Sequence, residues 1–131
     1  MPTFAFVWLI LSAAATEPSY AKRYELPSLP QQIWGQWNYD LKSCRDKSSL
    51  TRLTVGIDWV AGYEYQGRLL FTLPGLTDGR SEATVAKFVM GGEGSTWERE
   101  LTFSYSKARP NSLRIAAEKN GEEESFIRCI G

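Results

Sequence analysis

Apolar and polar residues alternate along most of the chain beyond its first third, and this period of two constrains the fold more than any other feature. Within residues 96–106, for example, Leu101 and Phe103 alternate with Glu100 and Thr102. No stretch shows the apolar spacing that an amphipathic helix of several turns needs. Alternation gives a strand one apolar and one polar face, which is typical of an antiparallel sheet packed on a core. The sequence therefore predicts an all-β protein.

Turn signals separate the predicted strands. Asp78-Gly79 and Asn120-Gly121 are typical of two-residue hairpin loops, and Gly91–Gly94 interrupts the pattern between two further strands. Consecutive hairpins favour a barrel, because closure of the sheet removes its exposed edges. We predict a small antiparallel up-and-down barrel of about seven or eight strands. The strands that the pattern indicates are near residues 35–41, 51–58, 62–73, 82–90, 96–106, 112–118 and 124–130.

The alternation also predicts which side chains face the barrel interior. These are Leu53, Val55, Ile57 and Trp59 near the second strand, Tyr63, Tyr65, Leu69, Phe71 and Leu73 in the third, and Trp97, Arg99, Leu101, Phe103 and Tyr105 in the fifth. Aromatic side chains on the inner face either fill a small barrel or line a ligand cavity within it. Both arrangements agree with the sequence.

The last hairpin can be assigned a register. A two-residue loop at Asn120-Gly121 pairs Ile115 with Phe126 and Leu113 with Arg128. Arg128 then lies on the apolar face, and Cys129, the next residue, points to the outside of the sheet.

The N-terminus is typical of a targeting segment. Residues 1–21 contain an apolar run followed by small residues, and they predict a signal peptide cleaved after Ala15 or Ala21. The apolar run is shorter than the roughly 20 residues that span a bilayer. Residues 22–33, punctuated by proline, are expected to form an extended arm, and residues 34–131 a single barrel domain. The predicted location is the periplasm or the extracellular space.

Cys44 and Cys129 are the only cysteines of the chain. An exported protein occupies an oxidising space, so the two cysteines are expected to form one disulfide bond. The alternative, two unpaired buried thiols, remains open on the sequence.

Composition excludes several classes of activity. The chain has no histidine, which removes the common nucleophile-histidine systems and histidine-ligated zinc. Lys and Arg balance Asp and Glu at a formal net charge of zero, so nucleic acid is not expected as a partner. Glu98 and Glu100 share a strand face, but that face is predicted to be in solvent, unlike a catalytic acid pair. We expect no enzymatic activity, no catalytic residues, no metal and no cofactor.

Gly35-Gln36-Trp37 on the first predicted strand, together with Arg128 near the end of the last, resembles the G-x-W pattern of lipocalins. The resemblance implies that Trp37 closes one end of the barrel and that Arg128 packs across its ring. A cation over an indole face is a favourable contact. Taken with the N-terminal signal, the segment Gly92–Trp97 and the terminal Arg-Cys, the chain also resembles small exported proteins of Gram-negative, especially alphaproteobacterial, cell envelopes. That second resemblance implies no activity.

Arg99, like Arg128, is a charged residue predicted to face inward, where an unpaired charge is costly. We predict that it lies near the barrel mouth with Trp97, Tyr63 and Tyr65, and that these residues bind a ligand. Pairing of Arg99 with Glu64 or Glu93, or exposure to water, are the alternatives. The predicted function is an exported binding protein for a small apolar or amphipathic ligand, which an anionic group would suit. The alternative is an interaction protein, such as a hydrolase inhibitor that acts through the Gly91–Thr96 turn.

Overall fold

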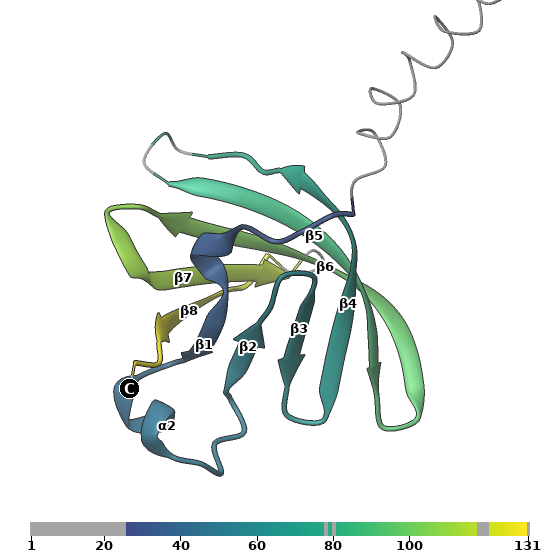
Figure 1. Cartoon of the computed structure of the whole chain (residues 1–131), viewed down its shortest axis with the longest axis vertical. Coiled ribbons are helices and arrows are strands. Elements are labelled where there is room, and N and C mark those ends of the chain that lie inside the picture. Colours follow the sequence, from purple (N-terminus) through teal and green to yellow (C-terminus); the bar gives the residue numbers. More distant parts are fainter. Residues whose placement is uncertain (1–25, 78, 80, 118–120, 131) are drawn as a thin grey trace, which may run out of the picture.

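The computed structural model describes residues 26–77, 79, 81–117 and 121–130 (Figure 1). Eight antiparallel strands, each paired with the next, form a closed barrel in which β1 also pairs with β8. This confirms the predicted all-β barrel. The elements are η1 (Gln31–Ile33), β1 (Gly35–Asn38), α2 (Leu41–Arg45), β2 (Leu53–Val55), β3 (Trp59–Gly62), β4 (Tyr65–Pro74), β5 (Glu82–Gly92), β6 (Ser95–Ser106), β7 (Arg109–Ala117) and β8 (Glu123–Arg128).

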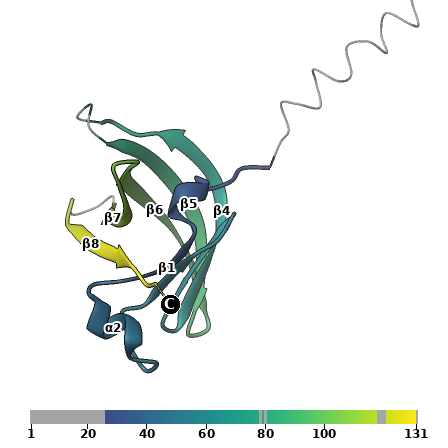
Figure 2. The ribbon, with the colours of Figure 1, turned by 60° about the vertical axis from the view of Figure 1, so that its left-hand side comes forward.

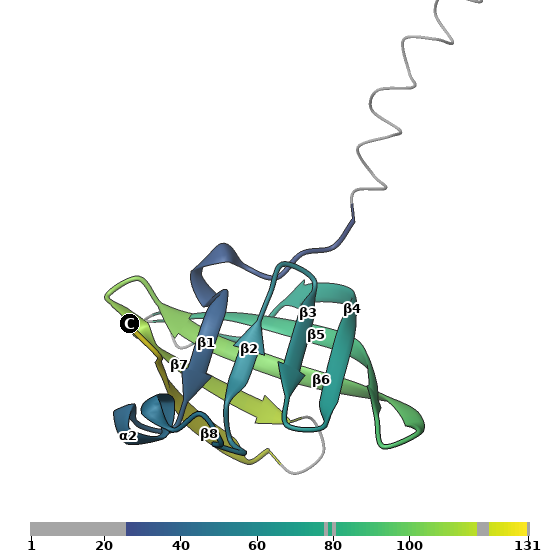
Figure 3. The same cartoon turned by 60° about the horizontal axis from the view of Figure 1, so that its bottom comes forward.

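The two ends of the barrel differ. The short helix η1 lies at one end, which we call the closed end, and the segment before it runs along that end (Figures 1 and 3). The helix α2 and the turn between β3 and β4 lie at the other, which we call the open end. Figure 2 shows α2 beside the end of β8. None of the helices in the described part of the chain is long and apolar enough to cross a membrane.

The hydrophobic core lies inside the barrel and extends to its closed end. Phe88 and Phe103, on neighbouring strands, meet edge to face with their ring centroids 6.2 Å apart. Leu29 and Ile33 come from the segment that we predicted as an extended arm, and they are also fully buried. Burial of each such side chain stabilises the fold by about 1.5 to 3 kcal/mol. The segment before β1 is therefore part of the core and closes the barrel.

The predicted strand 51–58 is wrong in its extent. The structure has two strands there, β2 and β3, which are joined by a tight turn at residues 56–58. The Gly56 N–H donates to the Trp59 carbonyl at 2.8 Å, and a Cβ on Gly56 would lie 2.1 Å from the Trp59 ring. The turn resets the alternation, so Val60 is buried, whereas Ile57 and Trp59 are exposed. The prediction that Ile57 and Trp59 face inward is therefore wrong.

Alternation along β4 is interrupted by a β-bulge at Leu70. Leu69 pairs with Phe88 of β5, and Phe71 pairs with Lys87, the residue directly before Phe88. Two steps along β4 therefore correspond to one step along β5. One extra residue in a strand reverses the faces of everything that follows it. Leu69 is consequently buried, but Phe71 and Leu73, which we predicted to face inward, lie on the outside and are about half exposed.

The register of the last hairpin also differs from the prediction. Leu113 pairs with Phe126, and Ile115 pairs with Glu124. Asn120, on which the predicted two-residue loop depended, lies outside the described residues, as does Asp78 of the other predicted turn. A shift of two residues leaves each side chain on its predicted face. Arg128 therefore still points to the barrel interior, opposite Trp37.

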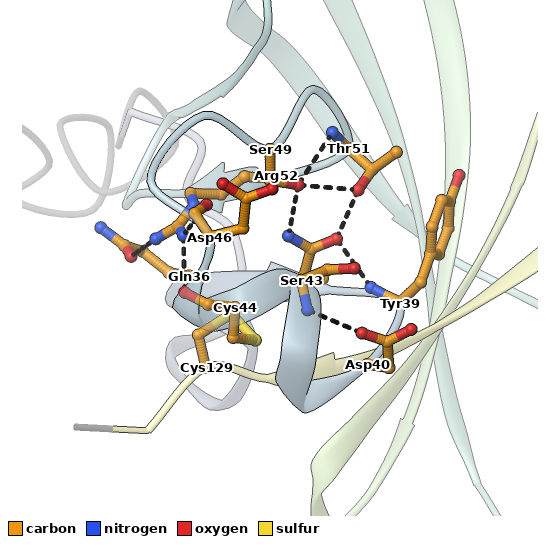
Figure 4. The surroundings of a disulfide bond; sticks show 11 residues. Gln36, Tyr39, Asp40, Ser43, Cys44, Asp46, Ser49, Thr51, Arg52 and Cys129 are labelled. Atoms are coloured by element: carbon orange, nitrogen blue, oxygen red, sulfur yellow. Dashed lines mark hydrogen bonds between the residues drawn. A yellow bond between two sulfur atoms is a disulfide. The ribbon is translucent and has the colours of Figure 1, made fainter.

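One disulfide bond joins Cys44 to Cys129 with an S–S distance of 2.04 Å (Figure 4), as predicted. The predicted first strand ends earlier than expected, at Asn38, because Asp40 caps a helix. The Ser43 N–H donates to the Asp40 carboxylate at 2.7 Å, and this hydrogen bond lowers the pKa of Asp40. The helix carries Cys44 to the outer side of β8, where Cys129 follows the strand.

Candidate ligand-binding site

Trp37 and Arg128 close the end of the barrel opposite to the candidate site. The guanidinium carbon of Arg128 lies 4.3 Å from the Trp37 ring centroid. Its nitrogens donate to the carbonyls of Trp34 and Gln32, both at 2.6 Å, and of Pro110 at 3.1 Å. The Trp37 indole N–H donates to the Ile33 carbonyl at 2.9 Å. The two residues therefore have the arrangement that the G-x-W pattern implied, and Trp37 is fully buried beneath Arg128 at this end.

The glycine of the pattern has its own structural role. Gly35 has a φ of +128°, a backbone conformation that residues with a Cβ atom rarely adopt. A Cβ at this position would also lie 2.8 Å from the Arg128 guanidinium. Gly35 therefore leaves room for the cation that covers Trp37.

The long connection between β1 and β2 contains α2 and lies at the open end (Figure 1), and Figure 4 shows hydrogen bonds within it. Asn38 is fully buried, and it donates to Ser49 Oγ at 3.0 Å and accepts from Thr51 Oγ1 at 2.6 Å. The Arg52 guanidinium donates to the Gln36 side chain at 2.9 Å and to the Cys44 carbonyl at 2.6 Å. These bonds hold the connection against the barrel and direct the charge of Arg52 toward the disulfide.

A cavity of about 290 Å³ lies at the open end, and we call it the mouth cavity. Its apolar floor is contributed by inward residues of six strands: Leu53, Val60, Met90, Leu101, Ile115 and Phe126. Polar side chains surround this floor, namely Tyr39, Thr51, Arg52, Tyr65, Arg99, Glu122 and Glu124. An apolar floor with a few polar groups above it is typical of a small-molecule site.

Arg99 supplies a cation to the mouth cavity. Among the described residues it has neither a hydrogen-bond partner nor an ion-pair partner. Glu64 and Glu93, its alternative predicted partners, instead occupy turns, where their φ angles are 63° and 50°. Burial raises the pKa of the nearby Tyr65 hydroxyl, and the charge of Arg99 opposes this shift. Arg99 and Tyr65 therefore offer a cation and a hydroxyl above the apolar floor.

Tyr39 and Glu124 form the second polar group of the mouth cavity. The Tyr39 hydroxyl donates a short hydrogen bond to the Glu124 carboxylate, and the Tyr39 ring stacks on Phe126 at 5.1 Å between centroids. This hydrogen bond is the main reason that the pKa of Tyr39 is raised to about 12, with burial adding to it. The negative charge of Glu124 is therefore partly satisfied within the protein.

Two of the four predicted ligand-binding residues do not line this cavity. Arg99 and Tyr65 line it, but Trp97 and Tyr63 do not. Tyr63 lies in the turn between β3 and β4, with 54% of its side chain exposed. Trp97 lies on β6 and pairs with Met90 of β5. Among the described residues, β6 pairs with β7 from Leu101 onward. Met90 is buried and lines the cavity, whereas Trp97 is 41% exposed and does not line it.

Sequence reasoning missed Tyr39, Glu124 and the buried Asn38. Tyr39 was placed inside the first predicted strand, although Asp40 just after it is a common helix-capping residue and marks the strand end. Glu124 falls at the start of the last predicted strand and was assigned no role from the sequence. Its inward direction depends on pairing with Ile115, which no local pattern reveals.

The structure places the remaining carboxylate pair away from the site. Glu98 lies on the outer face, where it approaches Lys87 at 3.7 Å, and Glu100 also pairs with Lys87 across the sheet. Among the described residues, no three His, Cys, Asp or Glu side chains are grouped so that they could hold a metal ion. Comparisons with models of known protein families, with curated sequences and with solved structures gave no match to this chain.

Proposed function

We propose that this protein is an exported, non-enzymatic binding protein that holds a small amphipathic ligand in the mouth cavity, as a small lipocalin-like barrel would. The observation that carries the proposal is the guanidinium of Arg99, which has no partner among the described residues and lies above an apolar floor. The ligand's apolar part contacts Leu101, Ile115 and Phe126. Its polar or anionic group meets Arg99 and the Tyr65 hydroxyl.

On the side of the cavity that it lines, Arg99 favours an anionic group over a cationic one. Glu124 already accepts a hydrogen bond from Tyr39, whereas Arg99 has no such partner in the described part of the chain. A carboxylate or sulfonate bound to a guanidinium forms charge-assisted hydrogen bonds. The apolar surface that the ligand covers adds about 25 cal/mol for each Å² removed from water.

The size of the cavity limits the ligand. About 290 Å³ is close to the lower end of the range for small-molecule pockets, so the proposed ligand is compact rather than a long lipid. Export remains part of the proposal, because the residues of the predicted signal peptide lie outside the described ones. The Cys44–Cys129 bond supports it, since such bonds persist in oxidising compartments.

Binding of the fluorescent probe 1-anilinonaphthalene-8-sulfonate tests this proposal, because the probe joins an aromatic body to a sulfonate. We expect saturable binding that weakens at least tenfold in Arg99→Ala and in Ala117→Phe, which would fill the cavity. Ala61→Phe is the matched control, since Ala61 pairs with Thr54 and Gln66 and does not line the cavity. Equal binding by all variants would contradict the proposal.

A second candidate is an interaction protein that contacts its partner through the Gly91–Thr96 turn. The exposure of Trp97 (41%) and Tyr63 (54%) near that turn favours it. Gly92 brings the turn against the backbone of Glu64, because any Cβ there would lie 2.3 Å from the Glu64 carbonyl oxygen. Inhibition of secreted proteases or glycosidases that is lost in Trp97→Ala, while probe binding persists, would support this candidate instead.

A further inference from the structure

A second cavity lies at the closed end, and we call it the closed-end pocket. Its volume is about 290 Å³, and its lining comes from η1, the β6–β7 turn and β8. The lining residues are Gln31, Gln32, Tyr105, Ser106, Lys107, Arg109, Pro110, Ser112 and Arg128. The pocket is separate from the mouth cavity, with which it shares no lining residue.

Three cations line this pocket, and its lining contains no carboxylate. The hydrogen bonds of Arg128 go to neutral backbone carbonyls, and no carboxylate among the described residues neutralises its charge. The side chains of Lys107 and Arg109 have neither a hydrogen-bond nor an ion-pair partner among the described residues. By register, Glu82 lies opposite Tyr105, but it lines the neighbouring groove instead of this pocket. Three like charges converge on one cavity, which is unfavourable unless an anion joins them.

Local structure fixes the backbone that carries Lys107 and Arg109 and the side chain of Arg128. Ser106 pairs with Arg109, so Lys107 and Ala108 form a tight turn between β6 and β7. The Ala108 N–H donates to Ser106 Oγ at 3.2 Å, which leaves the Ser106 hydroxyl proton free to donate elsewhere. Arg128 is fixed from the opposite side by the carbonyls of Gln32 and Pro110. The pocket is therefore largely formed before any ligand arrives.

We propose that the closed-end pocket binds an oxyanion, a phosphate or sulfate group, between Lys107, Arg109 and Arg128. Guanidinium groups match the geometry of such groups, and a lysine ammonium adds a point charge. The hydroxyls of Ser106 and Ser112 and the side-chain amides of Gln31 and Gln32 supply neutral donors at the same cavity. The group belongs either to a free anion or to the headgroup of an anionic phospholipid. This site does not depend on the function proposed for the mouth cavity.

Titration with inorganic phosphate, at constant ionic strength maintained with chloride, tests the site on the purified protein. We expect saturable NMR shifts of the backbone amides of Ser106–Arg109 and an affinity at least tenfold lower in Lys107→Ala/Arg109→Ala. Both positions are exposed, so this double variant is expected to fold. The matched control is Lys42→Ala/Arg68→Ala, which removes one lysine and one arginine from exposed positions outside the pocket. Absence of saturable shifts, or equal affinity in the two double variants, would overturn the proposal.

Vesicle sedimentation distinguishes the two sources of the oxyanion. Retention on phosphatidylglycerol vesicles but not on phosphatidylcholine vesicles, with competition by phosphate, assigns the site to a lipid headgroup. Phosphate binding without retention assigns it to a free anion. Vesicle retention that is equal in the two double variants would contradict the proposed site, because their net charges are the same and only one of them alters the pocket.

Discussion

Arg128 lies across the face of Trp37, with its guanidinium carbon 4.3 Å from the ring centroid, and the two residues are direct partners in the pairing of β8 with β1. The same guanidinium donates to backbone carbonyls before β1 and at the start of β7. One side chain therefore joins the first strand, the last strand and the segment that covers the closed end. Burial lowers the pKa of Arg128, but guanidinium groups remain charged in proteins.

Replacement of Arg128 with alanine is expected to lower the free energy of unfolding by roughly 2 to 4 kcal/mol, because it removes the cation over Trp37 and three hydrogen bonds. Urea unfolding followed by tryptophan fluorescence measures this change. Arg128→Lys keeps the charge but not the fork of donors, and we expect it to restore only part of the loss. An unchanged midpoint in Arg128→Ala would show that the contact does not stabilise the fold.

Gly35→Ala should destabilise the barrel by about 1 to 3 kcal/mol, because the backbone there has a φ of +128° and the new Cβ would lie 2.8 Å from Arg128. Gly91→Ala is the control, since a Cβ at Gly91 meets nothing within 4 Å. Thermal unfolding of both variants gives the comparison. Equal melting temperatures would contradict the role assigned to Gly35.

The disulfide bond should contribute strongly to stability. It joins residues separated by 85 positions, and the chain-entropy model gives about 4 to 5 kcal/mol for a loop of this length. The double variant Cys44→Ser/Cys129→Ser is therefore expected to unfold at a markedly lower urea concentration than the oxidised protein. Addition of a reductant should shift the wild type to the same midpoint and leave the double variant unchanged. If the reductant has no effect on the wild type, this account of the disulfide is wrong.

Tyr39 makes stability depend on pH in the alkaline range. Its pKa is about 12 in the folded protein, mainly because its hydroxyl donates to Glu124, and about 10 when unfolded. A raised folded pKa means that the stabilisation is fully present below pH of about 10 and is lost as pH rises toward about 12. Tyrosinate absorbance should show a transition near pH 12 that is absent in Tyr39→Phe, whereas the raised pKa of Tyr65 is unaffected by that change. In Glu124→Gln the Tyr39 transition should move toward the ordinary value, and a transition that stays in place would contradict the proposed cause.

Alternation predicted the all-β fold because each strand must present one face to a single core, and it placed Leu53, Leu101 and Phe103 correctly. It failed for Phe71 and Trp59, where a bulge and a tight turn each reverse the faces. Neither irregularity changes the spacing of apolar residues in the sequence. The error in the last hairpin left Arg128 on the correct face, because that error amounted to an even number of residues.

The candidate site was predicted only in part, for reasons that differ between residues. Arg99 was predicted because it is a charged residue at a position where the alternation expects an apolar one. The neighbouring residues of the sequence are enough to reveal this. Trp97 obeys the same alternation, but 41% of its side chain is exposed and it does not line the cavity. The Tyr39–Glu124 bond joins residues from opposite ends of the barrel sequence. Such a contact depends on closure of β1 against β8, which only the three-dimensional structure provides.

Native mass spectrometry tests the central claim most directly, on protein purified from its producing cells under conditions that preserve non-covalent ligands. Our account predicts a reproducible small-molecule adduct on the wild type and on Ala61→Phe. The adduct should be lost in Arg99→Ala and in Ala117→Phe, which alter the mouth cavity. A bare polypeptide mass with one disulfide for the wild type, or an adduct that persists in both cavity variants, would contradict the proposal that the mouth cavity holds a ligand.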